Sequence, residues 1–301
     1  MPDAPPATDR VLLFLHIPKT AGSTLGKVVT YQYAPADPAD KADPVPDVPL
    51  YDGTYWPPFD IYGTYYPPFD YDGTDGERLA HARHVLTTRR DQIRVVMGHF
   101  PFGIHELLPR PSTYATVLRH PVDRVVSLYY HTLKYSNNPL HERLVAEGIG
   151  LREFVTSISC EEADNDQTRR LSGLNPEFGR CSAEMLEVAK ANLRSHFSVV
   201  GITERFDETL VLAKRVLGWQ RDVHYWPSLV NRSRPPRESL PSDVVDVITE
   251  HNALDAQLYE FAVQLLDDLI GEQGAGFASE LGALRARQEQ LVKPNEHLIG
   301  I

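Results

Sequence analysis

The sequence predicts an α/β protein in which helices flank both faces of a central parallel sheet, giving three layers. Two observations indicate this class. Short apolar runs suited to buried strands alternate with segments of helical periodicity, and a polar loop follows each run. The 301 residues are predicted to form a single domain, because α/β units often reach this size.

The elements are predicted in chain order from these patterns. Residues 11–15 form an apolar run typical of a buried strand, and helix-compatible sequence begins near Ser23. Pro121 suits the first turn of a helix, and apolar residues then recur at helical spacing up to residue 134. The remaining predicted elements are helices over 77–90, 183–195 and 206–217, strands over 93–97, 114–118 and 197–201, and mostly helical sequence from 243 that ends in a helical C-terminal extension over 276–301.

Residues 34–76 differ in composition from the rest and are predicted to be an insertion rich in proline and tyrosine. A ten-residue unit repeats inside it over 51–60, 61–70 and, in part, 71–74. The Asp-Gly and Pro-Pro pairs of this unit favour turns, so the copies are expected to form successive turns or short hairpins. Two interpretations stay open: an aromatic lid or acceptor platform, and a surface excursion that packs its own rings.

Composition opposes several classes of function. The formal net charge of −11 argues against general binding to nucleic acid or to anionic membranes, since both need a basic face. No apolar stretch approaches the roughly 20 residues that span a bilayer. The start of the chain is proline-rich and acidic, unlike a secretion signal, so we expect a cytoplasmic protein. Cys160 and Cys181 are expected to be reduced thiols, although one optional pair stays open.

The segment His16-Ile-Pro-Lys-Thr-Ala-Gly-Ser-Thr24 follows the first predicted strand and leads into a helix. Its small residues let backbone N–H groups approach an anion, and a helix N-terminus favours negative charge. Lys19 and the hydroxyl side chains add further donors. This pattern predicts a phosphate site, but its lysine precedes the glycine, whereas nucleotide triphosphate loops end in Gly-Lys-Ser/Thr. The order disfavours an ordinary ATPase or kinase.

Two more polar clusters follow predicted strands. Arg119 lies where the third strand becomes a loop, and Ser127 lies about two turns into the next helix, so both are candidates for a second anion clamp. His99 ends the second strand and has an unperturbed pKa suited to general base catalysis. Two alternatives stay open: His99 caps the strand or packs with Phe100 and Phe102, or a glutamate or aspartate from elsewhere is the base. Ligands of open parallel sheets bind beyond the carboxyl ends of strands, where these clusters fall.

These motifs together strongly resemble those of the PAPS-dependent carbohydrate sulfotransferases, where PAPS is 3′-phosphoadenosine 5′-phosphosulfate. The resemblance rests on residues 16–24 paired with Thr116-Val-Leu-Arg-His-Pro-Val-Asp-Arg-Val-Val-Ser-Leu-Tyr-Tyr130, and it points to the heparan sulfate and uronosyl 2-O-sulfotransferase branch. Further similar stretches lie over 98–102, 164–173, 199–208 and 231–235. The resemblance implies a P-loop-like three-layer fold and sulfuryl transfer to an acceptor hydroxyl by in-line displacement.

The resemblance also implies roles for individual residues. Lys19 would act near the bridging oxygen, while the 5′-phosphosulfate would be wrapped by Thr20, Ala21, Gly22, Ser23 and Thr24. Arg119 and Ser127 would hold the 3′-phosphate, and His99 would be the catalytic base. The family often has aspartate where this chain has His120, so this chain departs from the family pattern in local charge there.

Other assignments stay open at this point. Residues 164–170 are candidates for acceptor or nucleotide contacts, or for helix caps and solvated turns, and residues 231–233 for a loop that closes over the nucleotide. His16 is expected to shape its loop rather than move protons. No metal is expected, because neither Cys-x-x-Cys nor His-Glu-x-x-His occurs.

The expected partner is a small-molecule, glycan or glycolipid acceptor, without nucleic acid, and the product of the donor would be adenosine 3′,5′-bisphosphate (PAP). Two alternatives remain: a P-loop phosphotransferase that uses ATP, and a catalytically inactive nucleotide-binding protein. The sequence does not predict the oligomeric state.

Overall fold

A computed structural model describes residues 10–33, 64–65, 76–136, 138–225 and 234–292. The ten-residue repeat, except for Thr64 and Tyr65, and residues 231–233 lie outside the described residues. The interpretations that concern these segments therefore stay predictions.

The sheet confirms the predicted α/β class. Its five parallel strands lie in the order β2-β3-β1-β4-β5, so β1 is central. The strands are β1 (Val11–Leu15), β2 (Thr64–Tyr65), β3 (Val95–Gly98), β4 (Ser112–Leu118) and β5 (Phe197–Ile202). Strand β2 was not predicted, because it consists of only two residues inside the insertion.

The helices agree closely with the helical periodicity of the sequence, and α4–α6 are additional. They are α1 (Gly22–Tyr33), α2 (Gly76–Thr88), α3 (Pro121–Lys134), α4 (His141–Glu147), α5 (Leu151–Thr156), α6 (Asp166–Ser172), α7 (Ala183–His196), α8 (Phe206–Val216), α9 (Ser242–His251), α10 (Ala253–Gly271) and α11 (Gly276–Val292). Short 3₁₀ turns are η2 (Ile104–Leu107), η3 (Glu161–Ala163), η4 (Thr203–Arg205) and η5 (Arg237–Ser239). Helix α11 occupies most of the predicted C-terminal extension.

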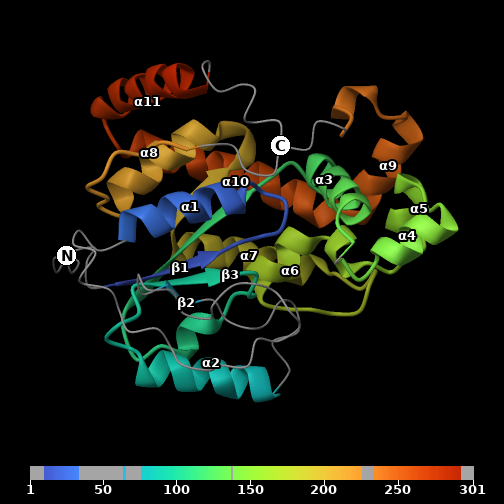
Figure 1. The fold of residues 1–301 in the computed structure, drawn as a ribbon, viewed down its shortest axis with the longest axis horizontal. Coiled ribbons are helices and arrows are strands. Elements are labelled where there is room, and N and C mark those ends of the chain that lie inside the picture. The colour runs from blue at the N-terminus through green and yellow to red at the C-terminus, as the bar shows by residue number, and fades with distance from the viewer. Residues whose placement is uncertain (1–9, 34–63, 66–75, 137, 226–233, 293–301) are drawn as a thin grey trace.

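Helices cover both faces of the sheet, as the buried strands require. Figure 1 shows α2 beyond one face, and α1, α8 and α10 beyond the other. All five residues of β1 are at most 1% exposed, because β1 is paired on both sides and covered on both faces. A second apolar cluster lies away from the sheet, where α3 packs with α4, α5 and α9. No described helix is both long and apolar enough to span a membrane.

This topology gathers the predicted polar clusters. Because β1, β3 and β4 are parallel, the loops that follow Leu15, Gly98 and Leu118 leave the same edge of the sheet. One region, the carboxyl edge of the sheet, therefore contains His99, Arg119 and the loop over residues 16–24, called here the phosphate-type loop.

Candidate active site

The loop between β1 and α1 has a backbone conformation that suits an anion. Lys19 and Ala21 have positive φ angles of 70° and 64°, whereas Thr20 between them does not. Alternation of this kind turns successive N–H groups toward one concave side, and such a nest binds anions. Left-handed backbone at non-glycine residues costs about 1–3 kcal/mol each, so the surroundings must hold it. The Thr20 hydroxyl does so by donating to the Ile17 carbonyl at 2.8 Å.

Gly22, the first residue of α1, allows His16 to pack against the loop. A Cβ atom at position 22 would lie 1.8 Å from His16 Cδ2, which is impossible without a shift. The His16 ring also contacts His99, with ring centroids 4.4 Å apart. Burial, followed by the neighbouring His99, lowers the pKa of His16 well below its usual value, so His16 is neutral. The His16 ring thus packs between Gly22 and His99, and a role in shaping the loop stays a prediction.

Basic side chains gather around this loop. The Arg119 Nη1 atom donates to the carbonyl oxygen of Lys19 at 3.1 Å, which joins the loops after β1 and β4. Burial lowers the pKa of Lys19 to about 8, with Arg119 and Arg234 also lowering it while Glu162 raises it. Burial and then Arg234 lower the pKa of Arg119 to about 10. Burial and, less strongly, neighbouring cations disfavour the charged forms of both side chains, and a bound anion would favour them.

One donor of this cluster has no partner in the described part of the chain. The Nε atom of Arg119 is buried and makes no hydrogen bond there. A buried N–H without an acceptor is costly, so an acceptor oxygen from a ligand would stabilise this side chain.

His99 is fixed in one tautomer. Its Nδ1 atom lies 2.8 Å from the backbone oxygen of His16. Because a carbonyl only accepts, Nδ1 carries the proton, and Nε2 of the neutral ring keeps the lone pair. This is the state that a general base needs.

The predicted site residues do not all meet. Thr20, Gly22 and Thr24 are buried, while Ser23 is exposed at the start of α1. Ser127 is half-buried on α3, and no hydrogen bond joins it to Arg119 within the described residues. The structure therefore brings Lys19, Arg119 and His99 into one region, and Ser127 stays a prediction.

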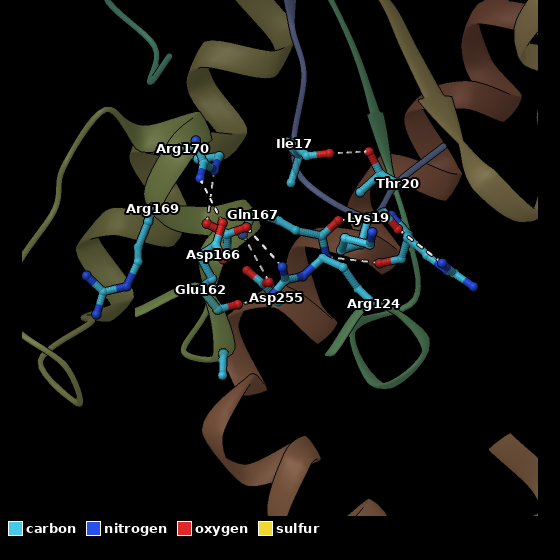
Figure 2. A network of polar contacts seen from close by, with 12 residues as sticks. Ile17, Lys19, Thr20, Arg124, Glu162, Asp166, Gln167, Arg169, Arg170 and Asp255 are labelled. Atoms are coloured by element: carbon cyan, nitrogen blue, oxygen red, sulfur yellow. Dashed lines mark hydrogen bonds and ion pairs between the residues drawn. The ribbon is translucent and has the colours of Figure 1, made fainter. Parts of the chain in front are cut away.

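Residues 164–170, for which solvated turns were one possibility, are instead buried, and helix α6 begins among them at Asp166. Asp166 binds two buried guanidinium groups: it accepts from Arg124 Nη1 at 2.9 Å and from Arg170 Nε at 3.0 Å (Figure 2). Arg170 Nη1 also donates to the backbone oxygen of His99. Helix α6 therefore helps to hold the backbone of His99, the candidate base, in place.

Helix α6 is anchored by exchanging caps with α10. The Asp255 carboxylate accepts from the backbone N–H groups of Gln167 and Thr168 at 3.1 and 2.8 Å. In return, Asn165 Oδ1 accepts from the N–H groups of Leu254 and Asp255 at 2.9 and 3.1 Å. Gln167 in turn bonds both the N–H and the carbonyl of Arg119, each at 2.9 Å. These caps supply the missing partners of both helix starts and position Arg119.

The comparison with known proteins decides the family. A family model described as galactose-3-O-sulfotransferase matches residues 69–295, which is more than half of the chain. The chain belongs to this family. The expected relationship to PAPS-dependent carbohydrate sulfotransferases is thereby confirmed, whereas the 2-O branch is not specified. The matched range begins after the phosphate-type loop, so the roles given to residues 19–24 rest on their geometry and on the motif resemblance.

Individual proteins similar to this chain include two galactose-3-O-sulfotransferases and a heparan-sulfate 6-O-sulfotransferase. Galactose-3-O-sulfotransferase 3 of Homo sapiens is 28% identical over 179 residues, which cover 55% of this chain and 41% of that protein. Galactose-3-O-sulfotransferase 2 of Mus musculus is 27% identical over 229 residues, covering 71% and 54%. Heparan-sulfate 6-O-sulfotransferase 1 of Cricetulus griseus is 27% identical over 285 residues, covering 85% and 67%. The chain thus spans about two fifths of the first of these relatives.

The expected cytoplasmic location is corrected by the same relatives. It was inferred from composition and from the start of the chain, whereas these proteins are named as sulfotransferases of galactose and of heparan sulfate. Substrates of this glycan type do not support a cytoplasmic assignment, and no compartment is assigned.

Two residues near the loop had no motif to indicate them. Glu162 has a side chain only 29% exposed and lies 3.5 Å from Arg170 Nη2, and its charge raises the pKa of Lys19. Burial and then the charge of Lys19 lower the pKa of His131 to about 4. The second half of α3 therefore lies close enough to the loop for the two side chains to interact electrostatically. Among the described residues, no group of three or more His, Cys, Asp or Glu side chains is arranged to hold a metal ion.

Proposed function

We propose that this member of the galactose-3-O-sulfotransferase family transfers the sulfuryl group of PAPS to a hydroxyl of a carbohydrate. The observation that carries the proposal is the cluster of Lys19 and Arg119 at an anion nest, with the pKa of each lowered. PAPS carries negative charge at its 5′-phosphosulfate and at its 3′-phosphate, and this cationic cluster is complementary to that charge.

The residues fit the donor in two parts. The nest and the start of α1, from Lys19 to Thr24, would hold the 5′-phosphosulfate through backbone N–H groups and hydroxyls. Arg119, with its unpaired buried Nε, would bind the 3′-phosphate, and Ser127 would add a hydroxyl. Arginine suits this task because its planar fork matches phosphate oxygens.

In the proposed step, His99 Nε2 takes the proton of the acceptor hydroxyl as that oxygen forms its bond to sulfur. The bond between sulfur and the bridging oxygen breaks in line, and its electron pair stays on the phosphate. Lys19 stabilises the charge that builds there. Arg170, through the His99 carbonyl, keeps the base in position, and positioning supplies much of the rate.

The acceptor is proposed to be a glycan or glycolipid, and the 3-hydroxyl of a terminal galactose is the first to test because of the family description. The net charge of −11 also favours a neutral sugar over a strongly acidic polysaccharide.

The competing functions make different predictions. A P-loop phosphotransferase would prefer ATP with magnesium, but the lysine of this loop precedes its glycine. An inactive nucleotide-binding protein would bind PAP without turnover.

The test is transfer of labelled sulfate from PAPS to a galactose-terminated oligosaccharide by wild type, His99→Asn and the exposed control His84→Asn. We expect His99→Asn to lose about 10²–10⁴-fold in kcat while it retains PAP binding, and His84→Asn to resemble wild type. PAP binding without transfer to any glycan acceptor would leave the inactive protein as the better account.

A further inference from the structure

A second candidate binding site lies at the opposite edge of the sheet. A cavity of about 180 Å³ opens where β4 and β5 begin, just before the start of β1. Its lining residues are Arg10, His105, Ser112, Thr113, Tyr114, Ser195, His196, Phe197 and Ser198. Strand β4 has seven residues, so this cavity lies roughly 20 Å from the loop after Leu118. It is therefore separate from the proposed donor site.

The polar groups of the cavity are mainly donors. The lining contains an arginine, two histidines and several hydroxyls, but no carboxylate, in a chain with formal net charge −11. The Nε atom of Arg10 is buried and has no hydrogen-bond partner in the described part of the chain. The rings of His105 and His196 lie side by side, with centroids 5.0 Å apart. Such a set of groups suits an anion with several acceptor oxygens.

Tyr114 fixes the tautomer of His105. The Tyr114 hydroxyl oxygen accepts from the backbone N–H groups of Gly103 and His105, at 3.3 and 3.1 Å. Both of its lone pairs are then used, so its own proton is directed to His105 Nδ1, 2.9 Å away. The neutral His105 ring therefore carries its proton on Nε2 and is a donor there. His196 and Ser195 are exposed, so the cavity opens to solvent on their side.

We propose that this cavity binds a sulfate or phosphate group, either as the free ion or as a monoester. Arg10 supplies the fixed positive charge, and His105, His196 and the hydroxyls of Ser112 and Ser195 supply further hydrogen bonds. The site is distinct from the proposed donor site.

The electrostatics agree with this geometry. Burial and then His196 lower the pKa of His105, while Glu106 beside it raises that pKa. A bound oxyanion beside His105 would favour protonation of that ring. The titratable groups that act on His105 are His196 and Glu106. Because the pKa of His105 is lowered, binding of sulfate, whose own charge is constant here, should strengthen as the pH falls below the usual histidine value of 6.5.

The experiment uses the full chain carrying Lys19→Ala and Arg119→Gln, which removes two charges from the proposed donor site. Sodium sulfate, sodium phosphate and methyl sulfate are titrated separately at constant ionic strength, with sodium chloride as control. The imidazole signals of His105 and His196 are followed by ¹H–¹⁵N NMR, assigned with His105→Asn and His196→Asn. Because the donor site is silenced, failure of the proposed transferase function leaves this test intact.

We expect both imidazole signals to shift together and to saturate with at least one of the three probes. Arg10→Gln should weaken that binding roughly tenfold or more, whereas the exposed control Arg83→Gln should not change it. If Arg10→Gln does not fold, Ser112→Asp is the second variant, since a carboxylate in the cavity should abolish binding. Shifts that stay linear for all probes, or that persist unchanged in these cavity variants, would overturn the proposal.

Discussion

The Nδ1 atom of His99 lies 2.8 Å from the backbone oxygen of His16, so the candidate base is bonded to the loop that holds the candidate donor site. The His16 ring fills the space between His99 and Gly22. The anion nest and the base therefore both contact His16, and displacement of the His16 ring should disturb both.

Gly22→Ala tests this coupling. The added methyl group would lie 1.8 Å from His16 Cδ2, so the imidazole must move, at a cost of about 1–3 kcal/mol in stability. We expect the variant to unfold at lower urea concentration and to bind PAP more weakly. Gly282→Ala is the matched control, because its Cβ meets nothing within 4 Å on helix α11, and it should be neutral or slightly stabilising. Unchanged PAP affinity in Gly22→Ala would show that the position of His16 does not affect the anion nest.

Arg119→Gln tests the second anion clamp. Loss of charge-assisted hydrogen bonds should weaken PAP binding about 10–100-fold. AMP lacks the 3′-phosphate, so its affinity should change little. Calorimetry with both nucleotides, and with Arg83→Gln as the exposed control, measures this difference. An equal loss for AMP and PAP would assign Arg119 to the 5′ side instead.

The pH dependence of PAP binding follows from Lys19. Its pKa is lowered to about 8, so the free protein loses this charge as the pH rises through 8, whereas Arg119 with a pKa of about 10 stays charged. Affinity should be steady near pH 7 and about tenfold lower at pH 9, because binding then requires uptake of a proton. Lys19→Arg should flatten the profile. A profile of wild type that is flat from pH 7 to 9 would contradict this role of Lys19.

Asp166→Ala tests the buried network beneath the site. The variant leaves Arg124 and Arg170 without their shared carboxylate, and both side chains are fully buried. We expect a loss of about 3–5 kcal/mol in the free energy of unfolding, measured with urea. As a control, Asp243→Ala breaks the ion pair between Asp243 and Arg152, whose side chains are 61% and 58% exposed, respectively. This change should lower the free energy of unfolding by about 1 kcal/mol or less. Equal losses would show that Asp166 contributes no more than a surface charge.

Much of the fold was predictable because buried parallel strands leave apolar runs in the sequence. Val11–Leu15 has no polar residue, and the helix at Pro121 has both a start signal and a clear period. Strand β2 was not predictable, since Thr64 and Tyr65 are two residues within turn-forming sequence and their partners in β3 lie 31 positions later.

The candidate site was only partly predictable. The loop motif indicated Lys19, and the strand ends indicated His99 and Arg119. The burial of α6 could not be inferred, because its residues are polar and are buried only by virtue of distant partners. Asp166 meets Arg124 42 positions away, and Thr168 meets Asp255 87 positions away. Such pairings depend on the tertiary fold and leave no local pattern.

The most direct test of the account is calorimetric titration of the purified chain with PAP, with AMP and with ATP, each with and without magnesium. A PAPS site at Lys19 and Arg119 should give saturable, magnesium-independent binding of PAP that is tighter than that of AMP or ATP and is lost in Lys19→Ala. Absence of PAP binding, or tighter binding of ATP with magnesium, would contradict the assignment of Lys19 and Arg119 to a PAPS site and would favour a phosphotransferase.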